Sequence, residues 1–169
     1  VSEEYERAAP GGTGAIKAAG NYAASLYASR IATQMGYTQV LWLDAQEKKY
    51  IEEVGTSNIF FFIGDELITP PLRGTILPGV MRRSILQLAA YLGIKVVERP
   101  LPIEEVISSI KSGQLKEAFA SGTAAVVSPV GQIYYRKKEY VINGGKTGPL
   151  AEMLFNEILQ LQYGFREDP

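Results

Sequence analysis

Residues 58–63 read Asn-Ile-Phe-Phe-Phe-Ile, a short and strongly apolar run of β-branched and aromatic side chains. Such a run predicts a buried β-strand. Two segments before it, Gln39–Ala45 (QVLWLDA) and Lys49–Glu53 (KYIEE), predict two more strands that a short polar turn joins. Together the three segments predict a meander of neighbouring strands.

One helix is predicted before this group of strands in the sequence, and three are predicted after it. Apolar residues recur at helical spacing in four segments, and glycines follow three of them as C-terminal stop signals. Asn21 is the expected N-cap of the first helix, and a proline suits the first turn of the last one. The predicted helices are Asn21–Met35, Val80–Leu92, about Ile103–Lys111 and about Pro149–Tyr163.

The remaining segments add further strands. Pro70-Pro71 ends the segment Leu67-Ile68-Thr69, because proline lacks the N–H that a strand needs. Other extended segments are Ile94–Glu98, Glu117–Ala120, Thr123–Val130, Gln132–Tyr135 and Tyr140–Ile142. The expected fold is α+β or mixed α/β: one large curved, mostly antiparallel, barrel-like sheet with packed helices. The 169 residues, 46% of them hydrophobic, suffice for a single domain over residues 1–169.

Two residue types are missing from the sequence, which contains no cysteine and no histidine. Thiol nucleophiles, disulfides, Cys/His zinc sites and histidine-based triads are therefore excluded, and no metal site is expected. If the chain is an enzyme, its chemistry must come from lysine, carboxylates, hydroxyls or a bound cofactor.

The charge pattern gives little information about partners. The formal net charge is −1, from 17 basic and 18 acidic residues, so neither nucleic acid nor an anionic membrane is expected as a partner. No apolar run approaches the roughly 20 residues that span a bilayer, and Val1–Arg7 lacks the apolar core of a secretory signal. Together with the absence of cysteine, this favours a cytoplasmic location.

Lys17 is the first candidate functional residue. It stands between Ile16 and Ala18-Ala19 in an apolar segment bounded by glycines. In such a setting a lysine is partly desolvated and its pKa falls, which is what a Schiff-base lysine needs. The alternative is an ordinary solvated surface lysine.

Glu53 is the second candidate. In an extended segment it shares a face with Ile51, while Tyr50 and Glu52 share the other face. If Ile51 points inward, Glu53 does so as well, and a buried carboxylate requires a cationic or hydrogen-bonding partner. The alternative is a carboxylate on the rim of an edge strand.

Two loops could bind an anion. The loop Gly74–Gly79 delivers Val80 and Met81 to a helix start, where free N–H groups and the helix dipole favour phosphate. It is not a nucleotide P-loop, because Val80-Met81 replaces the required Lys-Ser/Thr pair. Around Gly122, small residues expose backbone N–H groups and Thr123 offers a hydroxyl. By itself, this second loop is better explained as a simple turn between two core strands.

Taken together and in this order, these elements resemble the branched-chain amino-acid aminotransferases, pyridoxal-phosphate enzymes of fold type IV. The resemblance covers nearly the whole chain and implies their large, cofactor-binding domain. The segments that carry it are 8–14 (AAPGGTG), Lys17, 20–26 (GNYAASL), 39–45 (QVLWLDA), 50–58 (YIEEVGTSN), 77–79 (LPG), 122–125 (GTAA) and 128–130 (SPV).

The resemblance assigns three side chains to the cofactor ring. Lys17 would hold pyridoxal phosphate as a Schiff base and, once released by substrate, move the proton between the substrate Cα and the cofactor. Glu53 would keep the pyridine nitrogen protonated, which makes the ring an electron sink. Tyr22 would hydrogen-bond the phenolic oxygen of the ring; a tyrosine that merely packs on the first turn of a helix is the alternative.

The same resemblance places the backbone N–H groups of Val80 and Met81 and the side chain of Thr123 on the cofactor phosphate. Thr123 and Ala124 would also lie beside the substrate carboxylate. The implied reaction transfers the amino group between leucine, isoleucine or valine and 2-oxoglutarate, so the partners are branched-chain amino acids and 2-oxo acids. A homodimer is the implied assembly of the full-length enzyme.

The sequence also departs from the family pattern. Met81 stands where threonine is common, so one hydroxyl donor to phosphate is missing, and Ala19 stands where a second glycine is usual. No Cys-x-x-Cys pair is present near Ala125–Ser128. Family members are roughly twice as long, so the smaller N-terminal domain, which supplies an arginine to the phosphate, is expected to be absent from this chain.

Two other readings remain open at this point. The same fold could act on D-amino acids or aminodeoxychorismate, because those relatives share the lysine and the glutamate. Alternatively, the domain binds no cofactor by itself and serves only as a unit of folding or assembly.

Overall fold

A five-stranded sheet forms the centre of the protein, and the computed structural model describes residues 1–167. The strand order is β5-β4-β3-β6-β7, and only the β4–β5 pair is parallel among the pairs described. The strands are β3 (Asn58–Ile63), β4 (Glu66–Thr69), β5 (Lys95–Glu98), β6 (Leu115–Gly122) and β7 (Val126–Pro129). The apolar run 58–63 is therefore the central strand, with both neighbours antiparallel to it.

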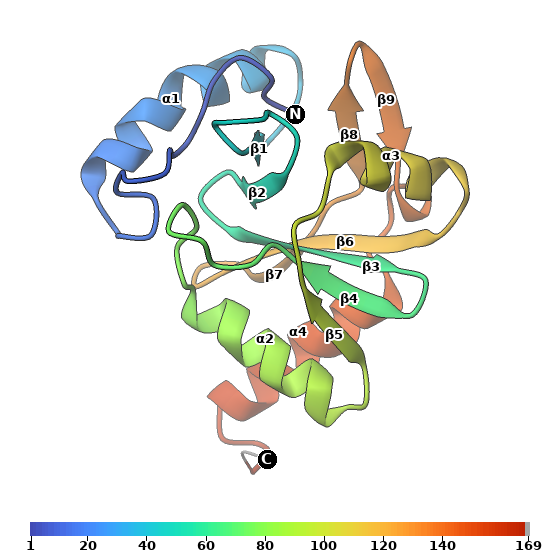
Figure 1. Cartoon of the computed structure of the whole chain (residues 1–169). Coiled ribbons are helices and arrows are strands. Elements are labelled where there is room, and N and C mark those ends of the chain that lie inside the picture. The colour runs from blue at the N-terminus through green and yellow to red at the C-terminus, as the bar shows by residue number, and fades with distance from the viewer. Residues whose placement is uncertain (168–169) are drawn as a thin grey trace.

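Alternating side chains of β3 enter two separate cores, because successive residues of a strand point to opposite faces. Phe60 stacks on Phe119 of β6, with ring centroids 5.3 Å apart, in the core under α2 (Val80–Tyr91) and α4 (Pro149–Gln162). Phe61 belongs to the opposite core, which α3 (Ile103–Lys111) helps to cover. In Figure 1, α2 and α4 lie below the sheet and α3 lies above it.

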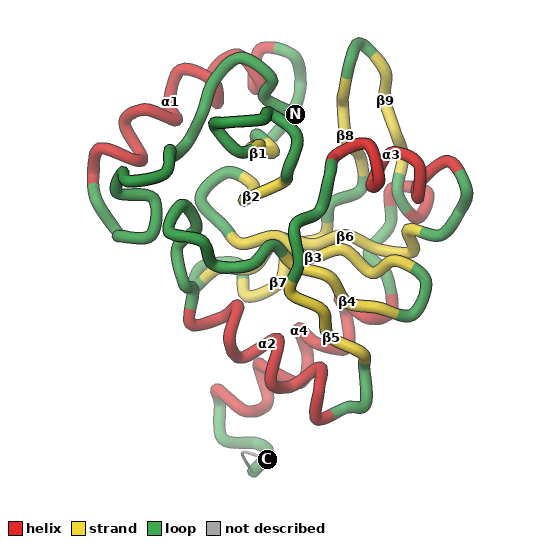
Figure 2. The backbone as a smooth tube through the Cα atoms, viewed as in Figure 1, coloured by secondary structure: helices red, strands yellow, loops and turns green. Residues whose placement is uncertain are grey.

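Two separate hairpins complete the upper layer. One is β1 (Leu41–Leu43) with β2 (Ile51–Val54), and the other is β8 (Gln132–Tyr135) with β9 (Lys138–Val141). A short 3₁₀ turn, η1 (Asn143–Gly145), follows β9. Figure 2 shows these strands in yellow; short connections, residues 55–57 after β2 and residues 130–131 before β8, join the hairpins to the five-stranded sheet. The mixed α+β class with a mostly antiparallel sheet and packed helices is confirmed, with the strands divided among three sheets.

The predicted meander is wrong at one point. β1 and β2 pair as expected, but β2 does not pair with β3. A tight turn intervenes, with a single bridge between Val54 and Ser57, and β3 then pairs with β4 and with the distant β6. Pairing is decided by which apolar faces can be buried together, and a local sequence pattern does not report this.

The first helix, α1 (Ala19–Gln34), packs outside β1, where its Ala28 contacts the core of Val40 and Trp42. It begins two residues earlier than predicted, and Ala18 is the N-cap. The assignment of Asn21 as N-cap is therefore wrong. The Asn21 amide instead donates to the carbonyls of Thr13 (2.7 Å) and Ile16 (2.9 Å), so it folds the preceding loop against the first turn.

None of the helices described in residues 1–167 combines the length and the apolar character that crossing a membrane requires.

Candidate active site

Glu53, in β2, is the most deeply buried carboxylate of the candidate site, with only 3% of the residue exposed. Its Oε1 accepts hydrogen bonds from the Asn58 side-chain amide (3.1 Å) and from the backbone N–H of Leu77 (3.1 Å). Its Oε2 lies 2.9 Å from Nε of Arg7, but the N–H direction makes this contact an ion pair rather than a hydrogen bond. Within residues 1–167, Oε2 accepts no hydrogen bond.

The environment of Glu53 opposes its ionisation. Burial raises the pKa of its carboxyl group to about 7, while the Arg7 guanidinium and the Leu77 N–H favour the charged form and the Glu52 carboxylate disfavours it. A carboxylic acid with this pKa is close to half-ionised at neutral pH. A nearby positive charge would therefore have a large effect on its protonation state.

Glu52 was expected on the opposite face of the strand from Glu53, yet all four residues of β2 are buried. The Thr75 hydroxyl donates to Glu52 Oε1, and Oε2 is buried without a hydrogen-bond partner. Burial raises the pKa of Glu52, against the effect of Thr75 and Arg7. The cluster thus contains two carboxyl groups and one guanidinium.

Arg7 joins the two loops that flank Glu53. Its Nη2 donates to the carbonyl of Thr75 and, at 3.5 Å, to the carbonyl of Gly14. Gly14 belongs to the loop before Lys17, and Thr75 to the loop before α2. Sequence reasoning missed Arg7, Thr75 and Asn58. Only Asn58 carried a signal, as a polar residue at the start of the apolar run 58–63.

The structure places Lys17 on the surface, in the loop just before α1, where the Ala18 N–H donates to the Ile16 carbonyl at 2.9 Å. The prediction that Lys17 is desolvated is therefore wrong for this chain, because the helix and the loop leave its side chain exposed. Its neighbour Ile16 lines a cavity of about 10 Å³ together with Tyr22 and Glu53. This volume accommodates about one water molecule. The loop of Lys17 thus meets Glu53, although the lysine side chain does not line the cavity.

The N-terminus of α2 lies against the start of β3. A Cβ atom on Gly79, the N-cap, would overlap Oδ1 of Asn58, so the Asn58 side chain packs directly against the Gly79 backbone. The first helical hydrogen bond of α2 runs from Arg83 N–H to Gly79, which leaves the N–H groups of Val80 and Met81 ahead of the helical ladder. The Val80 side chain is exposed, and that of Met81 is buried in the core.

The turn between β6 and β7 reaches the same end of the sheet. Asn58 pairs with Ser121, and a Cβ atom on Gly122 would lie 3.1 Å from the Ser57 hydroxyl. Thr123 and Ala124 follow in the turn, and both are exposed. The reading of this segment as a turn between two strands is confirmed. It lies near the α2 N-terminus because Asn58 contacts both.

The donor set of this region fits pyridoxal phosphate. Glu53 Oε2 is a largely buried acceptor without a donor, Tyr22 offers a phenol beside it, and the α2 N-terminus offers N–H groups for an anion. The cavity next to Glu53 is too small for a pyridine ring in this conformation.

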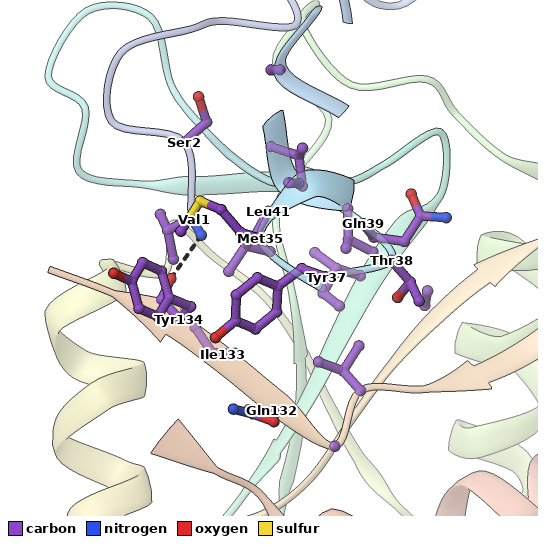
Figure 3. Close-up of a pocket in the computed structure, with 18 of the residues that line it drawn as sticks. Val1, Ser2, Met35, Tyr37, Thr38, Gln39, Leu41, Gln132, Ile133 and Tyr134 are labelled. Atoms are coloured by element: carbon purple, nitrogen blue, oxygen red, sulfur yellow. Dashed lines mark hydrogen bonds between the residues drawn. The ribbon is translucent and has the colours of Figure 1, made fainter. Parts of the chain in front are cut away.

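A larger cavity, of about 650 Å³, lies on the other side of β2 (Figure 3). Val54 lines it, whereas the adjacent Glu53 and Gly55 line the small cavity. The Val1 amino group donates to the Tyr134 carbonyl there at 2.9 Å, and the rings of Tyr37 and Tyr134 are 5.4 Å apart. None of the candidate cofactor residues lines this cavity, so the chemistry is not expected there.

Comparisons with known proteins agree with this geometry. A family model described as "Amino-transferase class IV" matches residues 4–133. A probable branched-chain-amino-acid aminotransferase of Staphylococcus aureus is 52% identical over 168 residues, which cover 99% of this chain and 47% of that protein. Branched-chain-amino-acid aminotransferase 2 of Bacillus subtilis is 51% identical over 97% of this chain and 45% of its own length.

Solved structures give the same result. The crystal structure of the Escherichia coli branched-chain amino acid aminotransferase superposes with a TM-score of 0.85 at 34% identity, and covers 99% of this chain and 52% of that one. The enzyme of Thermobaculum terrenum, solved in its PLP-form, has a TM-score of 0.82 at 30% identity, with 96% and 50% covered. The chain spans about half the length of the curated relatives that it matches.

Proposed function

The chain belongs to the class IV aminotransferases, and on that premise we propose that it is the cofactor-binding domain of a pyridoxal-phosphate enzyme that transfers the amino group between branched-chain L-amino acids and 2-oxoglutarate. One observation supports this proposal above the others. Glu53 is a buried carboxylate with one oxygen that accepts no hydrogen bond within residues 1–167. An acceptor of this kind suits a protonated ring nitrogen, because a charge-assisted hydrogen bond compensates for its desolvation.

The chemistry at the ring follows from three side chains. Lys17 Nζ would hold the cofactor and, when released, would move the proton to and from the substrate Cα. Glu53 would stabilise the protonated ring nitrogen, and Tyr22 would donate its hydroxyl proton in a hydrogen bond to the ring's phenolic oxygen. When bound, pyridoxal phosphate supplies the electron sink that makes the Cα proton acidic.

The anionic end of the cofactor would meet the N-terminus of α2. The free N–H groups of Val80 and Met81 are suited to a phosphate, and the Thr123 hydroxyl would add a donor from the β6–β7 turn. The buried thioether of Met81 leaves its backbone N–H as its only donor. Thr123 and Ala124, both exposed, would also contact the substrate carboxylate.

The substrate is proposed from the relatives, which are named branched-chain-amino-acid aminotransferases. D-amino acids or aminodeoxychorismate are the alternatives within the same fold. Amino transfer measured with L-leucine and with D-alanine separates these possibilities, and faster transfer from D-alanine would contradict the proposal. We further propose that residues 1–169 form a single domain, that a smaller N-terminal domain is absent from it, and that the full-length enzyme is a cytoplasmic homodimer.

A second candidate is that this chain alone binds no cofactor and serves as a unit of folding or assembly. The small cavity at Glu53 and the exposed position of Lys17 favour it. In that case added pyridoxal phosphate would leave the melting temperature of the chain unchanged, since a ligand stabilises a protein only by binding its folded state.

Borohydride trapping tests the proposal directly. The purified chain is mixed with pyridoxal phosphate, reduced with borohydride and digested, and the modified lysine is identified by mass spectrometry. We expect one dominant modified site at Lys17, its loss in Lys17→Ala, and its retention in Lys146→Ala, which removes another exposed lysine. Equal labelling of several lysines would show only their general reactivity and would contradict a built site.

A further inference from the structure

We propose that Arg7 is a positioning residue for Glu53: its guanidinium favours the ionised form of the buried carboxyl group and orients it, so that Oε2 remains available to a protonated ring nitrogen. This inference rests on the proposed function for its catalytic meaning. Its physical content, the control of Glu53 by Arg7, can be measured without any cofactor.

The first support is that the charged groups of Arg7 and Glu53 are in contact and largely buried from solvent. Arg7 Nε and Glu53 Oε2 are 2.9 Å apart, and the two side chains are only 7% and 4% exposed. At such a distance a charge pair interacts far more strongly when buried than in water. A change at Arg7 is therefore expected to act on Glu53 with little screening by solvent.

The second support is the charge balance of the cluster. Glu53 is influenced by Arg7 and by Glu52, and Glu52 in turn by Asp44. Tyr22, which lines the same cavity as Glu53 and Arg7, is the other titratable neighbour. With both glutamates ionised, one guanidinium faces two carboxylates. The cluster then lacks one positive charge, which a protonated pyridine nitrogen would supply.

The third support is the way in which Arg7 uses its donors. Nη2 donates to the carbonyls of Gly14 and Thr75, so the guanidinium is fixed from two loops. The Nε atom is buried, and its N–H group makes no hydrogen bond to Glu53. Arg7 therefore supplies positive charge without occupying the lone pairs of Oε2. Asn58 and Leu77 fix Oε1 on the other side.

A purely structural role for Arg7, in which it only links the two loops by hydrogen bonds, makes a different prediction. If Arg7 only links the two loops through hydrogen bonds, Arg7→Lys should have the same effect as Arg7→Met, because lysine lacks the planar set of guanidinium donors. A charge effect on Glu53 is largely retained in Arg7→Lys and lost in Arg7→Met. The titration of Glu53 therefore separates the two roles, and the melting temperature does not.

The experiment follows the side-chain carboxyl carbon of Glu53 by NMR in the ¹³C-glutamate-labelled chain between pH 4 and 9, with Glu53→Gln for assignment. We expect the midpoint to rise by roughly one to three pH units in Arg7→Met, the range in which an adjacent arginine shifts a carboxyl group. In Arg7→Lys the midpoint should stay within about one unit of the parent. Arg30→Met, which removes an exposed arginine of α1, should leave it unchanged.

An unchanged midpoint in folded Arg7→Met, or equal shifts in Arg7→Met and Arg7→Lys, would overturn the inference. Should Arg7→Met fail to fold, Glu52→Gln decides, because it removes a negative charge from the same cluster. The Glu53 midpoint is then expected to fall, and an unchanged midpoint would again refute control of Glu53 by this cluster.

The effect of Arg7 on bound pyridoxal phosphate is measured in a separate experiment. In the chain loaded with pyridoxal phosphate, the pH at which the visible absorbance changes should shift in Arg7→Met and not in Arg30→Met. A chain that shows the Glu53 shift but takes up no pyridoxal phosphate would refute the proposed function alone. A chain that binds the cofactor normally, with a spectrum and a Glu53 midpoint that Arg7→Met leaves unchanged, would refute only the inference about Arg7.

Discussion

Oδ1 of Asn58 occupies the space into which any side chain at Gly79 would project. This contact joins the start of β3 to the N-cap of α2, while the same asparagine donates to Glu53 and to the carbonyl of Leu77. Gly79→Ala should therefore displace Asn58 and destabilise the chain by about 1–3 kcal/mol, as overpacking typically does. Urea denaturation measures this loss.

Gly20→Ala is the matched control for that substitution. Gly20 lies in the first turn of α1, and a Cβ atom there meets open space. Alanine should stabilise the chain by roughly 0.4–1 kcal/mol, because it reduces the conformational freedom of the unfolded chain. Equal effects of the two substitutions would mean that the Asn58 contact does not constrain Gly79.

The stability of the chain should fall as the pH rises from about 4.5 to 7. The pKa of Glu53 is raised by burial from 4.5 in the unfolded chain to about 7 in the folded one, so the folded state binds more protons in this interval. The contribution of Glu53 is complete below pH 4.5 and is lost as the pH passes 7. At about 1.4 kcal/mol per pKa unit, the expected loss is about 3 kcal/mol.

Glu53→Gln tests the origin of this slope. The glutamine does not titrate, so its unfolding free energy should depend less on pH over the same interval, whatever its absolute stability. The raised pKa of Glu52 acts in the same direction and leaves a residual slope. The lowered pKa of Asp44 acts below this interval. Parallel pH profiles for the parent and Glu53→Gln would exclude Glu53 as the source.

Local sequence patterns predicted where helices and strands lie better than they predicted which strands pair. The boundaries of β3 and α3 agree with the sequence analysis, because their apolar spacing reports burial within one segment. The pairing of β3 with β6 was not predicted, since it joins residues about 60 positions apart in the chain, such as Asn58 and Ser121. A sequence pattern carries no record of which distant face covers a strand.

The candidate site likewise has features that the sequence could predict and features that it could not. Burial of Glu53 could be inferred from its phase with Ile51, but its ion pair with Arg7 could not, because nothing local distinguishes Arg7 from the other arginines. Lys17 was expected to be desolvated from its apolar neighbours, yet those neighbours are themselves largely solvent-facing, with Ile16 63% exposed. An apolar stretch indicates a dry environment only when another part of the fold covers it.

Glu117 should be essential for docking α4. Its two carboxylate oxygens accept hydrogen bonds from the N–H groups of Leu150 (2.9 Å) and Ala151 (2.8 Å), at the positive end of the helix dipole. Glu117→Gln removes the charge and replaces one acceptor by a donor. We expect a loss of roughly 1.5–3 kcal/mol in the unfolding free energy, the usual value for hydrogen bonds to a charged group.

Glu152→Gln gives the comparison for α4. Glu152 lies in the first turn of the same helix, but its side chain is exposed. Its loss should change the unfolding free energy by less than about 1 kcal/mol, because surface charge effects at a helix terminus are small and screened by salt. If both variants lost the same amount, helix charge rather than the buried hydrogen bonds would explain the effect of Glu117.

The phosphate role proposed for the α2 N-terminus can be tested by removing a single backbone N–H group. Val80 is the first residue of α2, a position at which proline is tolerated, and Gly79 before it is already extended, with φ −64° and ψ 139°. Val80→Pro should therefore fold normally while it lacks one phosphate donor. Its affinity for pyridoxal phosphate should fall roughly 10- to 100-fold, which corresponds to one charge-assisted hydrogen bond.

Val80→Ala separates the backbone group from the side chain, because it keeps the N–H and removes most of the exposed isopropyl group. Its affinity should match that of the parent when both are titrated by visible absorbance, with urea denaturation as the check on folding. An equal loss in both variants would assign the effect to the side chain. Unchanged binding in folded Val80→Pro would mean that the phosphate does not rely on this N–H, and the ring would then have to be placed away from the α2 N-terminus.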